Sequence, residues 1–316
     1  MQFRTKISIP IGENPIDYNS KILSLGSCFA VNMAEKFDYF KFQNTCNPFG
    51  ILFHPLAIEK LIDFVVSNKV FTEDDVFLHN ERWHSFDVHS DWSTSNKEEF
   101  IANLNAIIQS TKIYLQKSSH IIITYGTSWV YKNIDTNKIV ANCHKVPQKQ
   151  FVKAILSVET IENSIQNTIY NIQKINARSK IIFTISPVRH LKDGFVENQW
   201  SKAHLIAAIH KLKSLKFHSF DYFPSYEIMI DELRDYRFYT EDMIHPNQVA
   251  IDYIWEQFVK AYISVESYSI MKEVVAIQKG LQHRSFNPNS ESHQCFLSKL
   301  QDRKRSLQSK FPNITF

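Results

Sequence analysis

Short apolar stretches alternate with helix-length segments along this chain, and this alternation constrains its fold more than any other feature. Residues 120–125 (HIIITY) and 180–186 (KIIFTIS) are nearly continuous apolar runs. Such runs are typical of central strands that are covered on both faces. Weaker runs occupy 21–25 and 216–220, and the helix-length segments are 28–40, 55–67, 97–116, 159–176, 199–215 and 247–262. We therefore expect an α/β fold, with a doubly wound, mainly parallel sheet sandwiched by helices in a flavodoxin-like three-layer arrangement with loop insertions.

Two stretches interrupt this rhythm. Residues 71–96 are rich in His, Trp, Asp and Ser, and residues 131–150 predict a hairpin followed by a polar loop. Insertions of this kind commonly carry specificity in doubly wound folds. We expect a catalytic domain over 1–264 that contains both insertions, and a C-terminal extension over 265–316. The extension is expected to hold one helix, near 268–279, and a solvated basic tail.

The composition excludes several classes of protein. Hydrophobic residues make up 44% of the 316 residues, which excludes an unfolded chain. The 36 Lys and Arg residues barely outnumber the 32 Asp and Glu residues, so no nucleic-acid partner is expected. The four cysteines do not form a disulfide framework, and neither a signal peptide nor a membrane-spanning run is found. These features predict a soluble, cytoplasmic protein without a membrane partner.

The first candidate site is the string Leu25-Gly26-Ser27-Cys28, which follows a predicted strand and opens a predicted helix. The chain has only six glycines, so a glycine here indicates a sharp turn that needs one. The backbone N–H groups at a helix start favour negative charge, so we expect a lowered pKa for a thiolate at Cys28. Taken alone, the string also fits a tight turn with a buried cysteine and a capping serine.

The second candidate site is Asp242 and His245, three residues apart in a turn before the last long helix of the predicted domain. The carboxylate of Asp242 can orient the imidazole and stabilise its cation while the imidazole acts as a base. Pro246 and Asn247 suit a helix start. On its own this spacing is also common in surface turns.

Together, the two strings resemble the GDSL-type, or SGNH, ester hydrolases, in which a nucleophile follows the first strand and an Asp-x-x-His precedes the last helix. The resemblance covers residues 20–262. The string Gly-Ser-Cys-Phe-Ala at 26–30 more narrowly resembles the signature of the GSCFA family, a bacterial group within that superfamily. Further motifs agree with this: Asn47-Pro48-Phe49-Gly50, Gly126-Thr127-Ser128-Trp129-Val130-Tyr131, Asn142-Cys143-His144-Lys145 and Ser186-Pro187-Val188-Arg189-His190. The resemblance implies an SGNH hydrolase-like fold and a covalent acyl-enzyme.

The sequence departs from the SGNH pattern at the nucleophile. A gapless alignment of Leu-Gly-Asp-Ser places Cys28 at the nucleophile position, and a shift by one residue makes Ser27 the nucleophile instead. We favour Cys28, and Ser27 stays open as the alternative. A cysteine preserves covalent acyl transfer and favours thioester or transferase chemistry more than a serine does.

A second departure concerns the oxyanion hole, because Ser128 stands where the family usually has asparagine. Removing one donor of such a hole costs about 2.7–4 kcal/mol of transition-state stabilisation. The donors that the resemblance implies are the backbone N–H of residue 28, the N–H of Gly50, and the side chain of either Ser128 or Asn142.

Several polar residues are candidates for substrate binding. His84 and His89 are predicted to line a pocket wall, although local packing of polar loop residues explains them as well, and His144 is a further candidate for binding substrate. Arg189 and His190 follow a predicted strand and suit a substrate carboxylate or phosphate, or a salt-bridged rim. The histidines lack the spacing of a zinc site, so no metal and no cofactor is expected.

These interpretations favour a hydrolase that acts on acyl or acetyl ester bonds, including esters on carbohydrate. Its substrate would be a small-molecule or carbohydrate acyl ester. Two alternatives remain open. One is an acyltransferase that uses CoA or another thioester, which the thiol and the nearby cations Arg189, Lys145 and Lys192 suit. The other is a catalytically silent domain that binds glycan or serves as a scaffold.

Overall fold

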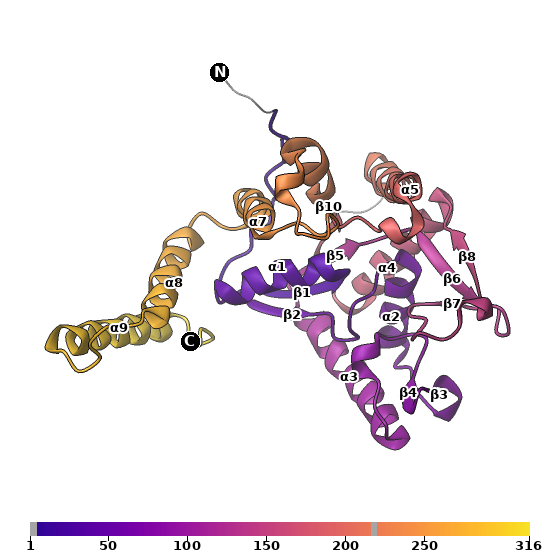
Figure 1. The fold of residues 1–316 in the computed structure, drawn as a ribbon, viewed down its shortest axis with the longest axis horizontal. Coiled ribbons are helices and arrows are strands. Elements are labelled where there is room, and N and C mark those ends of the chain that lie inside the picture. Colours follow the sequence, from indigo (N-terminus) through magenta and orange to yellow (C-terminus); the bar gives the residue numbers. More distant parts are fainter. Residues whose placement is uncertain (1–4, 216–219) are drawn as a thin grey trace.

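The computed structural model describes residues 5–215 and 220–316. Its main sheet has five parallel strands in the order β10-β9-β5-β1-β2, of which β10, β5, β1 and β2 are labelled in Figure 1. The strands are β1 (Lys21–Gly26), β2 (Gln43–Cys46), β3 (Phe77–His79), β4 (Arg82–His84), β5 (His120–Tyr125), β6 (Trp129–Asn133), β7 (Ile139–Val140), β8 (Phe151–Ile155), β9 (Lys180–Ile185) and β10 (Phe220–Phe223). The helices are α1 (Cys28–Tyr39), α2 (Pro55–Ser67), α3 (Lys97–Lys117), α4 (Val158–Ile175), α5 (Phe195–Ser214), α6 (Ser225–Glu227), α7 (Gln248–Tyr262), α8 (Ser267–Gln282) and α9 (Glu291–Lys310).

Helices cover both faces of this sheet, and alternation along the strands explains why. Successive strand side chains point to opposite faces. In β5, Ile121 and Ile123 are buried with α2, α3, α4 and α5, whereas Ile122 is buried on the other face with α1 and α7. A strand that is apolar on both faces needs two covering layers. The predicted three-layer α/β fold is therefore confirmed.

Most predicted elements are confirmed, with small shifts at their ends. The helix predicted at 55–67 and the strand predicted at 120–125 have the same bounds in the structure. The run at 216–220 lies outside the described residues except for Phe220, where β10 begins. Strand β2 has no apolar run to mark it, because all four of its residues are only partly buried at the sheet edge.

The insertions form small structures of their own. The hairpin predicted within 131–150 is confirmed, since β6 pairs with β7 in antiparallel fashion, and β8 adds a third strand on the other side of β6. The stretch 71–96 contains the hairpin of β3 and β4. These hairpins lie beside α2 and α4, on the opposite side of the sheet from α7 (Figure 1).

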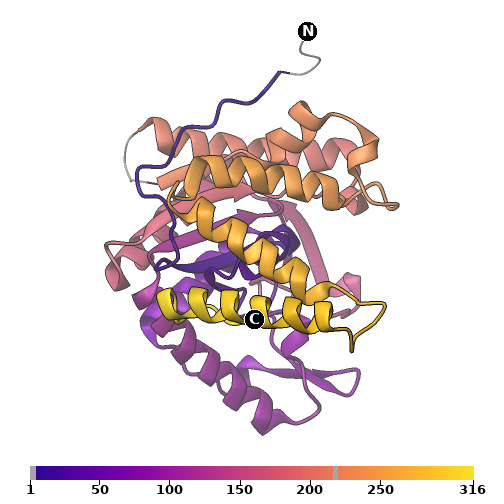
Figure 2. The same cartoon turned by 90° about the vertical axis from the view of Figure 1, so that its left-hand side faces the viewer.

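The predicted tail is largely helical, because most of its residues form α9, while most of its side chains are exposed as expected of a solvated segment. Leu300 and Leu307, spaced seven residues apart, are buried along this otherwise polar helix. The guanidinium group of Arg303 binds the carboxylate of Glu273 on α8 at 2.6 Å. Figure 2 shows α8 and α9 crossing the side of the molecule that faces the viewer. No helix within the described ranges is long and apolar enough to cross a membrane.

The turn between β1 and α1 requires glycine at position 26. Gly26 has a φ of +130°, and a Cβ atom there would lie 2.1 Å from the carbonyl oxygen of Thr124 on β5. The obstacle is backbone, so it cannot move aside without disturbing the sheet. We expect Gly26→Ala to lower the free energy of unfolding by at least about 3 kcal/mol, measured by chemical denaturation.

Gly280→Ala is the matched control for this change. A Cβ at Gly280, inside α8, would lie 2.7 Å from Cδ1 of Leu300, the end of a side chain that can turn aside, and its nearest neighbours are side-chain and not backbone atoms. Since alanine also favours a helix more than glycine does, we expect the stability of this variant to stay within about 1 kcal/mol of wild type. Equal losses in the two variants would contradict the assignment of a special role to the turn at Gly26.

Candidate active site

The turn at the carboxyl end of β1 presents Ser27 and Cys28 in different ways. Ser27 is the N-cap residue of α1, and its side chain is fully buried. Its Oγ has no hydrogen-bond partner among the described residues. Cys28 is the first residue of α1 and is only partly buried. A substrate can therefore reach the thiol of Cys28 more easily than the hydroxyl of Ser27.

The pKa of Cys28 is raised, so the expectation of a lowered value at the helix start is wrong. Burial of the thiol is the largest effect, and the positive charge of Lys202 and the backbone N–H groups of Phe29 and Cys28 act in the opposite direction. The N–H groups at the helix start thus have the predicted sign but are outweighed by burial. The resting side chain is a neutral thiol, which needs a base in order to become a nucleophile.

Asp242 and His245 form the pair that their spacing predicts. The Nδ1–H of His245 donates to Oδ2 of Asp242 at 2.7 Å. The other carboxylate oxygen, Oδ1, accepts from the hydroxyl of Thr240 at 2.6 Å and from the N–H groups of Ile244 and His245. These hydrogen bonds, led by that of Thr240, hold the pKa of Asp242 well below its usual range. The Asp242 carboxylate is therefore held in place, and it orients the imidazole of His245, which is half-exposed.

The loop that carries His245 is attached to the end of β9. The N–H of Arg189 donates to the carbonyl of Ile244 at 3.2 Å. Burial, together with the charges of Lys202 and His245, lowers the pKa of His190 to about 3. Lys202 in turn acts on Cys28. His190 and Cys28 therefore both lie within electrostatic range of Lys202, and His190 lies within range of His245 as well.

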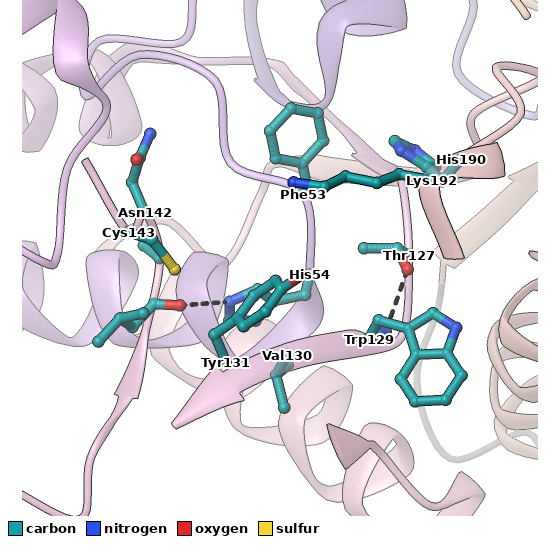
Figure 3. A pocket seen from close by; sticks show the side chains of 12 residues that line it. Phe53, His54, Thr127, Trp129, Val130, Tyr131, Asn142, Cys143, His190 and Lys192 are labelled. Carbon is teal, nitrogen blue, oxygen red and sulfur yellow. Dashed lines mark hydrogen bonds between the residues drawn. The ribbon is translucent and has the colours of Figure 1, made fainter. Parts of the chain in front are cut away.

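A cavity of about 340 Å³ opens beside this group, as Figure 3 shows. Its walls combine aromatic rings with a few polar groups, the composition of a small-molecule site. The residues that line it are Phe53, His54, Thr127, Trp129, Val130, Tyr131, Val140, Ala141, Asn142, Cys143, His190 and Lys192.

Gly126 connects the cavity to the turn at β1. A Cβ atom at this position would lie 3.2 Å from each of three atoms: Nε2 of His190, Cδ1 of Phe53 and Cβ of Ser27. His190 and Phe53 line the cavity, and Ser27 precedes Cys28. The Nε2 of His190 is buried and has no hydrogen-bond partner among the described residues. The absence of a side chain at Gly126 therefore lets the cavity wall approach the turn.

Two of the predicted oxyanion donors are already used within the protein. The N–H of Gly50 donates to the carbonyl of Asn47 at 2.7 Å. Ser128 is fully buried, and both its N–H and its hydroxyl donate to Ser201 on α5. The structure contradicts both assignments, because tertiary packing has given these donors other partners. Asn142 does lie on the cavity wall, although its Oδ1 accepts from the N–H of His144.

The prediction that histidines line a pocket wall is wrong for His84, and His144 does not line the cavity either. His84 is buried, with its ring nitrogens hydrogen-bonded to the carbonyl of His79 and the hydroxyl of Ser93. His144 is buried in the same way between Ser85 and Ser90. The two rings pack at 4.6 Å between their centroids. Neither ring lines the cavity.

His89 and Arg189 have local partners as well. Nδ1 of His89 lies 2.9 Å from a carboxylate oxygen of Asp91, and the Cβ of His89 packs against Gly50. The guanidinium of Arg189 lies over the ring of Tyr239, 4.0 Å from its centroid, and faces a separate small cavity. Of the five residues predicted to bind substrate, His190 alone lines the large cavity.

The buried imidazole of His54 predicts acid-sensitive stability. Its Nδ1 accepts from the N–H of Ala57 at the start of α2, and its Nε2–H donates to the carbonyl of Val140 (Figure 3). Burial lowers the pKa of His54 from 6.5 to about 4. The unfolded chain therefore takes up this proton at a higher pH than the folded protein does. The free energy of unfolding falls as the pH drops through this window.

His54→Asn keeps a side chain suited to the N-cap but does not titrate, so it removes this contribution. Between pH 6.5 and pH 4 we expect wild type to lose about 3 kcal/mol more stability than the variant, at about 1.4 kcal/mol per pKa unit. Chemical unfolding at the two pH values measures the difference. Equal losses in both proteins would show that His54 does not titrate in this way.

The profile of the GSCFA family matches residues 21–258, which is more than half of the chain and contains both candidate strings. The chain belongs to the GSCFA family. A second profile, described as the C-terminal domain of GSCFA domain proteins, matches residues 274–316, most of α8 and all of α9. No curated protein matches the chain.

Sequence reasoning missed two residues of this GSCFA site. Lys202 lies in the middle of α5 and is fully buried, and nothing in its sequence neighbourhood marks it. Asn47 accepts the N–H of Gly26 at 2.7 Å through Oδ1, while its buried Nδ2 has no partner among the described residues. The match of Asn47 to a family motif was a signal, but it did not reveal this role. Within the described ranges, no three His, Cys, Asp or Glu side chains group as metal ligands.

Proposed function

We propose that this chain is an SGNH-type acyl hydrolase that acts on ester bonds through a covalent thioester on Cys28. The observation that carries the proposal is the hydrogen bond between Nδ1 of His245 and Asp242, at 2.7 Å. It fixes the tautomer in which Nε2 is free to accept a proton, and among the described residues Nε2 has no hydrogen-bond partner. This arrangement matches the base and orienting carboxylate of acyl-transfer enzymes.

The proposed reaction has two steps. In the first, the Sγ of Cys28 attacks the ester carbonyl while its proton moves to Nε2 of His245. Collapse of the tetrahedral intermediate breaks the bond to the alcohol, which leaves with the proton from His245. In the second step, His245 takes a proton from water and the resulting hydroxide attacks the thioester carbonyl. The carbon–sulfur bond then breaks, which releases the acid, and the thiolate of Cys28 recovers its proton from His245.

The oxyanion would be held at the start of α1. The N–H groups of Cys28 and Phe29 lie in the first turn of the helix, where they have no carbonyl partner within the helix. The side-chain amides of Asn142 and Asn47 are the further candidates, in place of Gly50 and Ser128. The macrodipole of α1 adds to the attraction for negative charge.

The cavity indicates the part of the substrate that would bind. The rings of Phe53, Trp129 and Tyr131 suit an apolar acyl chain or the C–H face of a sugar ring. A carbohydrate ester or a simple acyl ester is therefore the proposed substrate class. A transferase reaction with a CoA thioester is a second candidate, favoured by the thiol nucleophile and by Lys192 on the cavity wall.

Intact-mass analysis after incubation with 4-nitrophenyl acetate tests the proposal. We expect one acetyl group per protein to appear on the Cys28 peptide, followed by its loss to water. Faster loss in the presence of an alcohol or amine acceptor would favour transfer over hydrolysis. If the native protein is never acylated but binds glycan, the proposal fails and the scaffold alternative gains support.

A further inference from the structure

A buried lysine lies next to the turn that carries the proposed nucleophile. Lys202, on α5, is fully buried, and its Nζ donates to the carbonyl of Gly126 at 2.6 Å and to that of Ser186 at 2.7 Å. These carbonyls are just beyond the ends of β5 and β9. A single side chain therefore ties together the two strand ends next to the turn at Cys28.

The charge on this lysine has no carboxylate partner. None of the ion pairs between described residues includes Lys202, although a buried ammonium group is costly unless it is compensated. Besides the two carbonyls, the ring of Tyr226 lies 5.4 Å from Nζ. A neutral side-chain donor could satisfy these two carbonyls without the free-energy cost of burying a charge. The hydrogen bonds to the carbonyls therefore do not explain why this residue is a lysine.

Cys28 is the group whose charge complements that of Lys202. Burial lowers the pKa of Lys202 to about 7, and the interaction with Cys28 opposes this shift. The same interaction lowers the pKa of Cys28 against the effect of burial. His190 also faces Lys202, and its pKa is lowered to about 3, so it stays neutral near pH 7 and does not compete as a cation.

We propose that Lys202 is a positioning residue of the Cys28 site, whose ammonium group stabilises the thiolate as it forms and holds the ends of β5 and β9 around it. The inference rests on the proposed role of Cys28 as nucleophile. It assigns a function to a residue that needs no contact with the substrate. The thiolate and the ammonium group favour one another, so they titrate as a pair.

The test is the pH dependence of Cys28 alkylation by iodoacetamide in the full chain, followed peptide by peptide with mass spectrometry. In Lys202→Met, which removes the charge and keeps most of the side-chain volume, we expect the midpoint for Cys28 to rise by about one pH unit or more. Lys202→Arg keeps the charge and should retain a midpoint nearer that of wild type. Cys46 and Cys143 in the same samples are internal controls, whose midpoints should not change.

Lys211→Met is the matched control variant, because it removes a half-exposed lysine of the same helix whose partner is Glu162 on α4. It should leave the Cys28 midpoint unchanged. An unchanged midpoint in folded Lys202→Met would overturn the proposal, as would an equal shift in both variants. If Lys202→Met does not fold, Lys202→Gln replaces it, because an amide still donates to the carbonyls of Gly126 and Ser186 but carries no charge. A higher Cys28 midpoint in Lys202→Gln supports the proposal, and an unchanged one overturns it.

This experiment is independent of the proposed function. Alkylation reports the ionisation of the thiol, whereas acylation by 4-nitrophenyl acetate reports acyl transfer. A shift of the Cys28 midpoint in Lys202→Met without acylation of wild type supports the inference and rejects the proposed reaction. Acylation of Cys28 with a midpoint that does not depend on Lys202 supports the proposed reaction and rejects the inference.

Discussion

Cys28→Ala will lose covalent labelling by an activated ester, with a rate of acylation at least about 1000-fold below wild type. Ser27→Ala will still be labelled. The reason is access: the Ser27 side chain is fully buried, whereas Cys28 is partly exposed in the first turn of α1. The measurement is intact-mass analysis at a series of times, with peptide mapping to locate the acyl group.

Two controls make this result specific. Cys46→Ala removes another partly buried cysteine and should label as wild type does. Cys28→Ser retains a nucleophile of similar size that is less readily ionised, so we expect slow but detectable acylation. Labelling that survives in Cys28→Ala and disappears in Ser27→Ala would identify Ser27 as the nucleophile, and survival in both variants would reject the mechanism.

His245→Ala will lower the rate of acylation by about 100-fold to 10,000-fold, the usual contribution of a positioned general base. The neutral thiol of Cys28 makes this base necessary, because burial raises the pKa of Cys28 above its usual value. The rate is measured from the release of 4-nitrophenol under single-turnover conditions. At a pH high enough to ionise the thiol, the variant should recover part of the rate.

Asp242→Asn is the companion variant. It preserves a side-chain oxygen that can accept the N–H groups of Ile244 and His245, yet it removes the charge that stabilises an imidazolium. We expect a loss of rate similar to that of His245→Ala, and little added loss in the double variant, since the two side chains act as a unit. His283→Ala, an exposed histidine in the C-terminal extension, serves as the control. Additive losses would show that Asp242 and His245 act separately.

The parts of the site that depend on neighbouring residues in the chain could be predicted from the sequence. Asp242 and His245 are three residues apart, and the turn between them is enough to bring Nδ1 to Oδ2. Gly26 is predictable for the same reason, because a strand that turns directly into a helix needs a residue that tolerates a positive φ. Geometry that is determined by a few neighbouring residues does not depend on the partners that the rest of the fold supplies.

Predictions that depended on which partner each polar group finds were less successful. His84 and His144 belong to motifs rich in polar residues, yet their ring nitrogens are all hydrogen-bonded to the protein. The N–H and the hydroxyl of Ser128 are likewise hydrogen-bonded to Ser201. A buried polar group takes the partner that tertiary packing brings to it, and residues distant in sequence supply that partner.

The sequence by itself determined the α/β architecture, the placing of Cys28 at a turn from a strand into a helix, and the placing of Asp242 and His245 in a turn before a helix. Apolar periodicity and local turn chemistry act over short stretches, so they can be read without a structure. The tertiary structure alone decided that Ser27 is inaccessible, that burial outweighs the helix start at Cys28, and that the charge of Lys202 acts on the thiol. Desolvation and long-range charge interactions depend on every element packed around a group, and so they exist only once the chain has folded.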